Sequence, residues 1–404
     1  MNPLMKLNRL VAFVWLVLIG TSVAAYYSGV GTAFEDFIAE NAPAETGAYL
    51  RNVVLLGAAY FLLLFRTQFL RLLSFNDFLF ILLLFVVPIF LMVLSERSFD
   101  FGDYTSQISC ALVFIVASII GMQTELNRPV LIAAYAIVVV GSGLNLYELF
   151  FDNNLWSIAP GRSAGFYVNP NITAGALVGY AMVYLTARFD RVRRADVILL
   201  ALLILGVLTT FSRAGILACL VLVMALVFTR VGSEFPGRKI FVAAIILFST
   251  VALAQYMLQT LELSEDAITR MLSLRNSGGI GDYGEERGAA AINALDLVVD
   301  NLLFGNGVRT IYSMEEGPHN MFVAMLVDYG IVGLIAYLVV IARLMLIARR
   351  ADRNLSGMIW AFVTWLVIFS FVSHNLLDTL VTLPLMGFAL ARAYKIHSLS
   401  SQGE

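Results

Sequence analysis

Residues 77–95 read DFLFILLLFVVPIFLMVLS, and Asp77 at one end is the only charged residue in this run. A helix rises about 1.5 Å per residue, so a run of this length can cross the hydrocarbon core of a bilayer, which is about 30 Å thick. The chain as a whole is 60% hydrophobic and 13% charged, with a mean hydropathy of +0.85. This composition lies far outside the range of soluble proteins, so the sequence predicts an all-α, polytopic membrane protein.

Similar apolar runs recur along nearly the whole chain and predict about 12 transmembrane helices in a single integral membrane domain, residues 1–404. The runs fall at residues 9–28, 48–65, 77–95, 105–123, 129–149, 171–187, 196–211, 214–229, 240–258, 329–348, 356–373 and 379–395. The first run lacks a small-residue cleavage site, so we expect an uncleaved anchor and not a signal peptide.

The distribution of charge predicts the orientation of these helices. With the N-terminus inside, 18 of the 26 basic residues face the cytoplasm and about 21 of the 28 acidic residues lie outside. This asymmetry satisfies the positive-inside rule and predicts that both termini are cytoplasmic. Basic loops such as RFDRVRR at 188–194 are expected to contact membrane lipids. The net charge of −2 gives no indication of nucleic-acid binding.

Neither the two cysteines nor the known sequence motifs indicate a bound cofactor or metal ion. Cys110 and Cys219 both lie inside apolar runs, and without flanking histidines they cannot hold a structural zinc ion, so we interpret both as packing residues. The chain contains no Gly-rich nucleotide loop, no HExxH and no Asp-rich cation motif. We therefore predict no cofactor and no metal site.

Eight basic residues remain on the outer side of the membrane, and all of them are arginine. They are Arg51, Arg97, Arg162, Arg213, Arg270, Arg275, Arg287 and Arg309. Topology keeps positive charge out of outer loops, so this cluster suggests a function. Arginine grips phosphate well, because its planar fork donates two parallel charge-assisted hydrogen bonds.

The first outer motif is GRSAGFYVNPN at 161–171, which contains Arg162. Asn169 and Asn171 flank a proline, and this pattern predicts a turn followed by the start of a helix. Free amide groups at a helix N-terminus bind anions. The structural alternative is a tight loop with an arginine at the membrane interface.

The second outer motif is FSRAG at 211–215, in which Ser212 and Arg213 separate two apolar runs with almost no loop. A hairpin this short does not require an arginine, and its position opposes the topology rule. The alternative to phosphate binding is an arginine that snorkels to the lipid headgroups.

A long outer segment, residues 259–318, is predicted as a periplasmic loop inserted between the ninth and tenth spans. From Glu286 onward an apolar residue recurs at helical spacing, and a turn with two glycines follows. The apolar positions are Ile292, Leu295, Val299 and Leu302, and the turn is Gly305-Asn306-Gly307. We expect an amphipathic helix that lies against the membrane surface or over the bundle and acts as a lid.

The third motif surrounds this helix. Arg287 stands near its start, GNGVRT at 305–310 follows it, and GPHNMFVAMLVDYGIVGLIAYL at 317–338 returns to the membrane. His319 lies where the loop meets the next helix, and histidine is the side chain best able to exchange a proton near neutral pH. The alternative is a histidine that only satisfies hydrogen bonds at the interface. His374, also followed by Asn, closes the eleventh span.

Together these motifs resemble the O-antigen ligase family, which also takes in O-antigen polymerases and related exopolysaccharide polymerases. The shared features are an RxxGFYxNPN loop, an SRAG hairpin, a long outer loop with an arginine before an apolar helix and a GxG turn, and HN leading into DYGIVG. The resemblance is strongest over residues 155–340. It implies a GT-C-type glycosyltransferase of the bacterial inner membrane that takes a glycan from an undecaprenyl-diphosphate carrier at the periplasmic face.

The resemblance also implies roles for individual residues. The essential loop arginine of the family matches Arg287, its essential histidine matches His319, and the arginines of the other two motifs match Arg213 and Arg162. Arginines would stabilise the charge that develops on the diphosphate, and His319 would accept the proton of the attacking hydroxyl. The implied reaction is inverting and independent of metals. Supporting residues are predicted to be Asn320, Ser212, Asn169, Asn171 and Arg309.

The alternatives to a ligase that stay open are a polymerase, a transporter and a non-catalytic scaffold. The acceptor is lipid A–core in ligases and another carrier-linked repeat unit in polymerases, and the motifs separate these activities weakly. A transporter of lipid-linked glycan would also bind phosphate, but transporters usually carry polar groups near the bilayer midplane and two related halves. The predicted spans are nearly free of charge at their centres and show no convincing internal repeat, which favours an enzyme.

Overall fold

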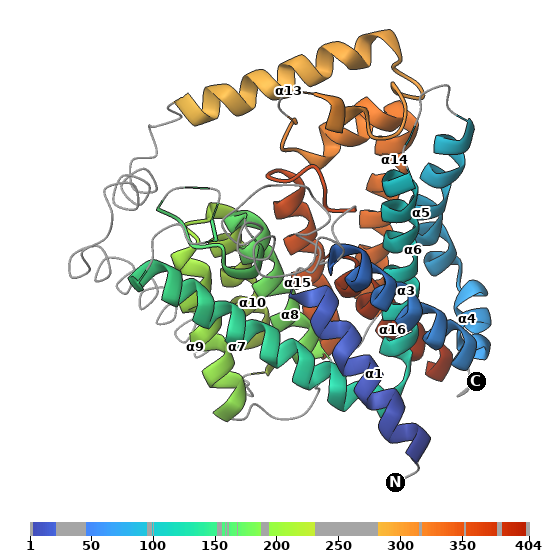
Figure 1. Ribbon diagram of the computed structural model, residues 1–404, viewed down its shortest axis with the longest axis vertical. Coiled ribbons are helices and arrows are strands. Elements are labelled where there is room, and N and C mark those ends of the chain that lie inside the picture. The colour runs from blue at the N-terminus through green and yellow to red at the C-terminus, as the bar shows by residue number, and fades with distance from the viewer. Residues whose placement is uncertain are drawn as a thin grey trace. The chain divides into compact units, whose positions relative to one another are not determined.

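The computed structural model describes residues 3–21, 46–94, 99, 101–151, 156–157, 159, 161–167, 169–186, 194–230, 282–314, 317–350, 353–377 and 382–400. Every regular element in these ranges is a helix, which confirms the all-α prediction (Figure 1). The chain divides into two compact units. Unit 1 comprises Met1–Val54, Gln123–Ser277 and Arg350–Trp365, and unit 2 comprises Leu55–Met122, Gly278–Arg349 and Leu366–Glu404.

Unit 1 is organised around α7 (Asn127–Phe151). The short helix η2 (Thr124–Leu126) leads into it, and it packs against α1 (Pro3–Gly20), α8 (Pro170–Thr186) and α9 (Arg194–Thr209). The last helix of the group, α10 (Arg213–Arg230), packs against α8 and α9. Gly215 allows α10 and α8 to approach closely, because a Cβ at this position would lie 2.3 Å from the Cβ of Ala174. The N-terminal ends of α8 and α10 therefore lie side by side.

Unit 2 is organised around α6 (Phe101–Met122), which packs against α16 (Thr382–Ser400), α5 (Asn76–Leu94) and α4 (Arg66–Leu73). Aromatic side chains join α5 to α6: the ring centroid of Phe114 lies 5.3 Å from that of Phe78 and 5.1 Å from that of Phe85. The axes of α3 (Thr46–Leu64) and α4 differ in direction by 83° at the break between the two helices.

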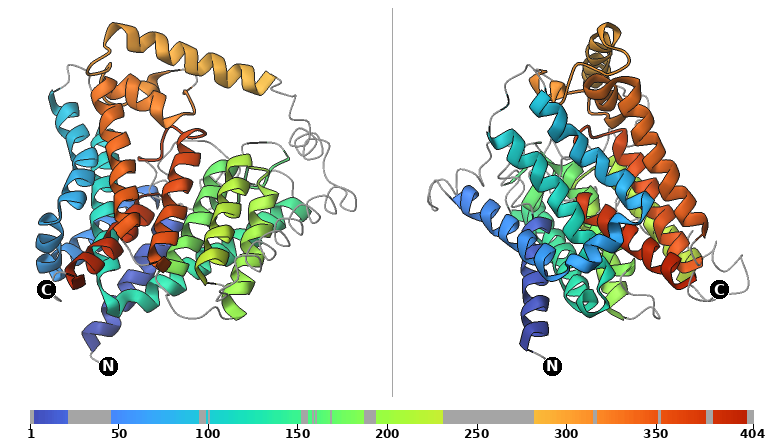
Figure 2. Two further views of the ribbon diagram at one scale, coloured as in Figure 1. Left: turned by 180° about the vertical axis from the view of Figure 1, so that it is seen from behind. Right: turned by 90° about the vertical axis from the view of Figure 1, so that its right-hand side faces the viewer.

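The remaining long helices are α14 (Met321–Arg350) and α15 (Arg353–Ser370). Gly330 interrupts α14 with non-helical backbone angles, φ 64° and ψ −160°. In unit 2, α13 (Asp282–Asp300) lies crosswise over the N-terminal end of α14, as two further views also show (Figures 1 and 2). A buried hydrogen bond of 2.7 Å between Tyr337 and Ser370 joins α14 to the last turn of α15.

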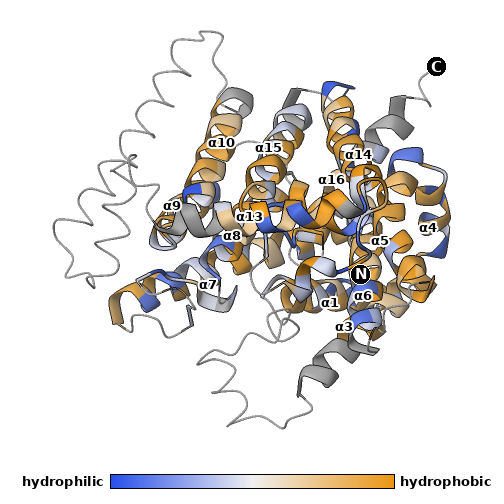
Figure 3. Ribbon diagram, turned by 90° about the horizontal axis from the view of Figure 1, so that it is seen from above, coloured by the Kyte–Doolittle hydropathy of each residue, from blue (hydrophilic) through white to orange (hydrophobic). Residues whose placement is uncertain are grey.

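The predicted spans agree well with these helices. The run at 240–258 lies outside the described residues, and each of the other runs overlaps a described helix. Within the described part, 5 helices are long and apolar enough to cross a membrane, or 6 if the bent pair of α3 and α4 counts as one span. Hydrophobic residues dominate the helices (Figure 3). The chain is thus a multi-pass membrane protein, while a total of twelve spans stays a prediction.

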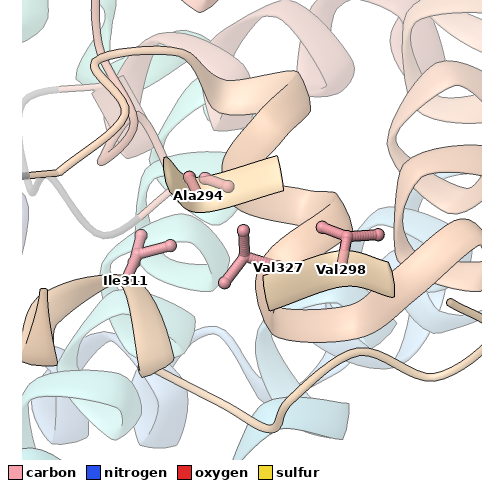
Figure 4. Close-up of a cluster of buried hydrophobic side chains, with 5 residues drawn as sticks. Ala294, Val298, Ile311 and Val327 are labelled. Atoms are coloured by element: carbon pink, nitrogen blue, oxygen red, sulfur yellow. The ribbon is translucent and has the colours of Figure 1, made fainter. Parts of the chain in front are cut away.

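The expected helix is confirmed in the described part of this segment, and its small residues make its contacts with the protein. Ala294 and Val298 of α13 point toward Ile311 and Val327 in a small buried cluster (Figure 4). In contrast, the predicted stripe is exposed, with Ile292 at 61% and Val299 at 77%. Small residues let α13 approach its neighbours closely, and the spacing of the larger residues could not reveal this.

Both cysteines are buried, as expected for packing residues. Cys110 in α6 is 1% exposed and Cys219 in α10 is 5% exposed. The expected periplasmic loop is described only from residue 282, so its earlier part lies outside the described residues.

Candidate functional site

A buried carboxylate organises the first motif of unit 1. Glu148, near the C-terminal end of α7, is 1% exposed. Its Oε1 accepts backbone N–H bonds from Trp156 (3.0 Å) and Ser157 (2.8 Å), and its Oε2 accepts them from Ala164 (2.7 Å) and Gly165 (3.0 Å). An ionised carboxylate can accept about four such bonds. Glu148 therefore fixes two stretches of backbone, one on each side of Arg162.

Arg162 links the first motif to the second. Its Nε donates to the carbonyl oxygen of Thr210 (2.8 Å), which lies two residues before Ser212, and its Nη2 donates to Oδ1 of Asn171 (3.0 Å). The backbone N–H of Ser163 also donates to the carbonyl of Thr209 (3.1 Å). The structure therefore brings the motifs at 161–171 and 211–215 together within unit 1.

The polar residues of these motifs begin the adjoining helices. Oδ1 of Asn169 accepts the backbone N–H of Asn171 (2.9 Å) at the start of α8. In the same way, Oγ of the buried Ser212 accepts the N–H of Gly215 (3.2 Å) at the start of α10. Serine and asparagine are preferred at such N-caps, where they satisfy amides that have no partner in the helix. Arg213, the first residue of α10, is exposed.

In unit 2, the turn GNGVRT docks on the break in α14. Gly305 (φ 74°) and Gly330 (φ 64°) meet backbone to backbone, because a Cβ on Gly305 would lie 2.5 Å from the nitrogen of Gly330. A Cβ on Gly330 would lie 2.4 Å from the carbonyl oxygen of Leu303. The N–H of Ile331, freed by the break, donates to the carbonyl of Leu302 (2.9 Å). The glycines of both motifs are thus required by close contact as well as by positive φ.

Arg309 is held in this turn by two carboxylates. The buried side chain of Asp328 accepts the backbone N–H groups of Arg309 (3.0 Å) and Ile311 (3.1 Å). The guanidinium of Arg309 forms an ion pair of 2.6 Å with Asp103 of α6. It also lies over the ring of Tyr312, 5.0 Å from its centroid, in η4 (Thr310–Ser313). These contacts fix the loop to α6, which is a supporting role.

His319 lies just before α14 and has a left-handed backbone, with φ 44°. The next residue, Asn320, caps α14, since its Oδ1 accepts the N–H groups of Phe322 (2.9 Å) and Val323 (3.2 Å). Left-handed angles are uncommon for residues other than glycine and often mark functional sites. The cap and this local geometry fix the place of His319 at the end of α14.

His374, in the segment that follows α15, lies beside His319. The centroids of the two imidazole rings are 5.5 Å apart, and the ring of Tyr312 lies 5.9 Å from that of His374. Burial, and then the charge of His319, lower the pKa of His374 to about 4. The neutral form of His374 is therefore favoured at neutral pH. The structure brings together two histidines that the sequence suggested only as separate interfacial residues.

The other outer arginines are described less fully. Arg287 lies in α13 and Arg51 in α3, but the structure describes only their backbone. Arg97, Arg270 and Arg275 lie outside the described residues. Within the described part of the chain, no group of three or more His, Cys, Asp or Glu side chains is arranged to hold a metal ion.

Residues 198–338 match the family model of O-antigen ligases. This match confirms the resemblance to the O-antigen ligase and polymerase family. It extends from α9 to the middle of α14 and includes Arg213, Arg287, Arg309 and His319. No curated protein matches the chain. Members of that family are glycosyltransferase-like enzymes that act on a lipid-linked glycan and an acceptor.

Several residues that shape these sites were not predicted from the sequence. Glu148 lies inside the predicted span 129–149, and a carboxylate within an apolar run is a recognisable signal. Asp328 begins the DYGIVG motif, but nothing in that motif indicated that its carboxylate binds backbone amides. Asp103 and Tyr312 carried no signal, because their importance rests on contacts with Arg309 that only the fold creates.

Proposed function

We propose that this protein is an O-antigen ligase-type glycosyltransferase that transfers a glycan from undecaprenyl diphosphate to lipid A–core at the periplasmic face of the bacterial inner membrane. The observation that carries this proposal is His319. It is the residue that matches the family's essential histidine, and it combines a left-handed backbone with an imidazole neighbour at a helix end.

The proposed reaction needs a base and a group that stabilises charge. His319 accepts the proton of the acceptor hydroxyl as the hydroxyl oxygen attacks the anomeric carbon from the side opposite the carrier, so the configuration inverts. The bond between the sugar and the diphosphate breaks, and its electron pair stays on the diphosphate. Arg287, Arg213 and Arg162 then stabilise this negative charge, which preorganised guanidinium groups do without the aid of a metal ion.

The contacts within the motifs support the separate roles proposed for residues that hold the backbone and residues that bind the diphosphate. Asn169, Ser212 and Asn320 act as helix caps, and Arg309 is engaged by Asp103. These residues therefore support the backbone, while Arg213 is exposed at the first position of α10. A helix N-terminus adds partial positive charge beside that arginine, which favours an anionic ligand.

The test is transfer by the purified protein, with undecaprenyl-diphosphate-linked glycan as donor and lipid A–core as acceptor. We expect glycan on lipid A–core, and a loss of roughly 10²–10⁴-fold in His319→Gln, since base catalysis contributes about that much. His397→Gln in α16 is the matched control and should keep full activity. Longer carrier-linked glycan in place of capped lipid A–core would make the protein a polymerase, and near-normal turnover in His319→Gln would remove His319 as the base.

The arginines are tested by comparing lysine with alanine. Arg287→Lys should be impaired nearly as strongly as Arg287→Ala, because a point charge does not reproduce the bidentate fork of a guanidinium. The loss should appear in the initial rate of transfer at normal membrane levels of the variant. Full activity in both variants would exclude Arg287 from the binding of the diphosphate.

A further inference from the structure

The ring of His374 is contacted by groups from two other segments of unit 2. His319 approaches it from the segment before α14, and Tyr312 approaches it from η4. Gly317 lies against the ring as well, because a Cβ at this position would lie 2.8 Å from Cε1 of His374. A side chain at residue 317 would therefore push the ring away, and glycine at this position leaves room for it.

His374 has unused capacity for hydrogen bonding. Its Nδ1 is buried and has no hydrogen-bond partner among the described residues. Buried polar atoms are nearly always paired, so an exception calls for an explanation. In a neutral imidazole one nitrogen donates and the other accepts, and rings with centroids 5.5 Å apart can bring two nitrogens within hydrogen-bond distance, about 3 Å.

We propose that His374 is a positioning residue for His319, which it orients and from which it accepts a hydrogen bond once His319 carries the proton of the acceptor hydroxyl. This inference rests on the proposed function, because it assumes that His319 is the base. The proton moves from the hydroxyl oxygen to a nitrogen of His319, is held there by a nitrogen of His374, and passes to water when the product leaves.

The surrounding charges favour a neutral His374 in this role. Among the described residues, the titratable groups whose rings contact that of His374 are His319 and Tyr312. Arg309 lies over Tyr312, and its positive charge is paired with Asp103. Burial lowers the pKa of His374 to about 4, with the charge of His319 as a second cause. A neutral His374 can accept a hydrogen bond from His319 once His319 has taken the proton of the acceptor hydroxyl.

The alternative is that His374 only fills space against Gly317 and Tyr312. His374→Phe separates the two roles, because phenylalanine keeps a planar ring but has no nitrogen. With His374 as an acceptor, kcat should fall about 10- to 100-fold in His374→Phe, as a hydrogen bond to a charged group is lost. The KM for the carrier-linked donor should not change. Normal kcat in His374→Phe would overturn the proposal.

Histidine NMR provides a readout that does not depend on turnover. The chain has only 3 histidines, so the full protein labelled at the imidazole Cε1, in detergent micelles, gives three signals. Single Gln substitutions assign them. We expect His374 to stay neutral down to about pH 4. In His374→Phe the midpoint of the His319 titration should move down by about one unit, because the charged form loses a hydrogen bond. His397→Gln is the control and should leave both signals unchanged.

The two measurements distinguish the possible failures. If His319→Gln has lost transfer but His374→Phe shows normal kcat and an unmoved His319 midpoint, the positioning role is wrong and the base is retained. If His319→Gln transfers glycan at a normal rate, His319 is not the base of the proposed function. The proposed role of His374 is then wrong as well, because it assumes that His319 is the base.

Discussion

Replacing Glu148 tests whether the outer motifs depend on a single buried carboxylate. In Glu148→Gln the side chain keeps its shape but has one oxygen in place of two. Two of the four backbone N–H groups, those of Trp156 and Ser157 or those of Ala164 and Gly165, then face an amide NH₂ group. Donors that face donors lose their hydrogen bonds while they stay buried, so the change acts on the folded state directly.

The expected cost follows from these contacts. A hydrogen bond to a charged group contributes about 1.5–3 kcal/mol, so the loss of two bonds costs about 3–6 kcal/mol if the segment stays in place. The segment can open instead, which limits the loss of global stability and releases Arg162 from Thr210 and Asn171. We therefore expect Glu148→Gln to lower the melting temperature and to reduce glycan transfer at least as much as Arg162→Ala does.

Hydrogen exchange measured by mass spectrometry locates the effect. In Glu148→Gln the amides of one of the two pairs, Trp156 and Ser157 or Ala164 and Gly165, should exchange faster, while those of α10 should change little. Glu125→Gln, an exposed glutamate in η2, is the matched control and should resemble the unchanged protein. Unchanged melting and unchanged exchange at residues 156–167 in Glu148→Gln would refute the reasoning, since the four bonds would then carry no net stability.

Three further predictions concern the fold and its charges. Gly330→Ala should lower the melting temperature sharply, because it combines positive φ with a backbone clash, whereas Gly143→Ala has open space and should be neutral or mildly stabilising. A cysteine at the exposed Ser313 should react with a membrane-impermeant reagent in intact cells and one at Arg349 should not; the reverse pattern would invert the proposed topology. For His374 the folded pKa of about 4 lies below its unfolded value of 6.5. The unfolded state therefore takes up the proton first as the pH falls from 6.5 to about 4, so the melting temperature falls there, while in His374→Phe that part of the pH dependence is lost; equal slopes would contradict it.

The helices could be predicted because their cause is local. Long apolar runs and the turns between them indicate helices wherever a bilayer removes water from the backbone. The face by which α13 packs against the protein could not be predicted, for a physical reason. Ile292 and Val299 lie seven residues apart, and Ala294 and Val298 lie four apart. Both spacings place a pair of residues on one face of a helix, so the sequence does not show which face a neighbour can approach. The face with the smaller side chains packs against the protein, because small residues allow the neighbouring segments to come close.

The candidate site residues could likewise be predicted only in part from the sequence. The resemblance pointed to arginines and histidines, and the neighbours that orient them depend on tertiary contacts. Glu148 binds amides that follow it in the chain, but the pairing of His319 with His374 joins segments on either side of α14 and α15. A single sequence does not show that these two histidines are neighbours, since both are followed by Asn and the two His-Asn pairs look alike.

Backbone strain connects the motifs that the sequence singled out. Among the described residues, the non-glycine positions with positive φ are Phe211, Arg309 and His319. Each lies within one of the quoted motifs. Such angles cost about 1–3 kcal/mol and persist only where the surroundings enforce them. The enforcing groups at Arg309 are the carboxylates of Asp328 and Asp103, which fix the backbone and the guanidinium of the same residue.

Substitutions at the N-caps of these motifs change the local backbone as well as the side chain. Asn320 caps α14 and Ser212 caps α10, so alanine at either position removes a bond that fixes the backbone of the neighbouring His319 or Arg213. Loss of activity there does not identify a chemical role, because N-cap loss costs about 1 kcal/mol in itself. Asn320→Asp keeps the acceptor and the cap, so it should keep the fold. A loss of transfer in Asn320→Asp at unchanged melting temperature would then mean that the amide, and not only the cap, acts beside His319.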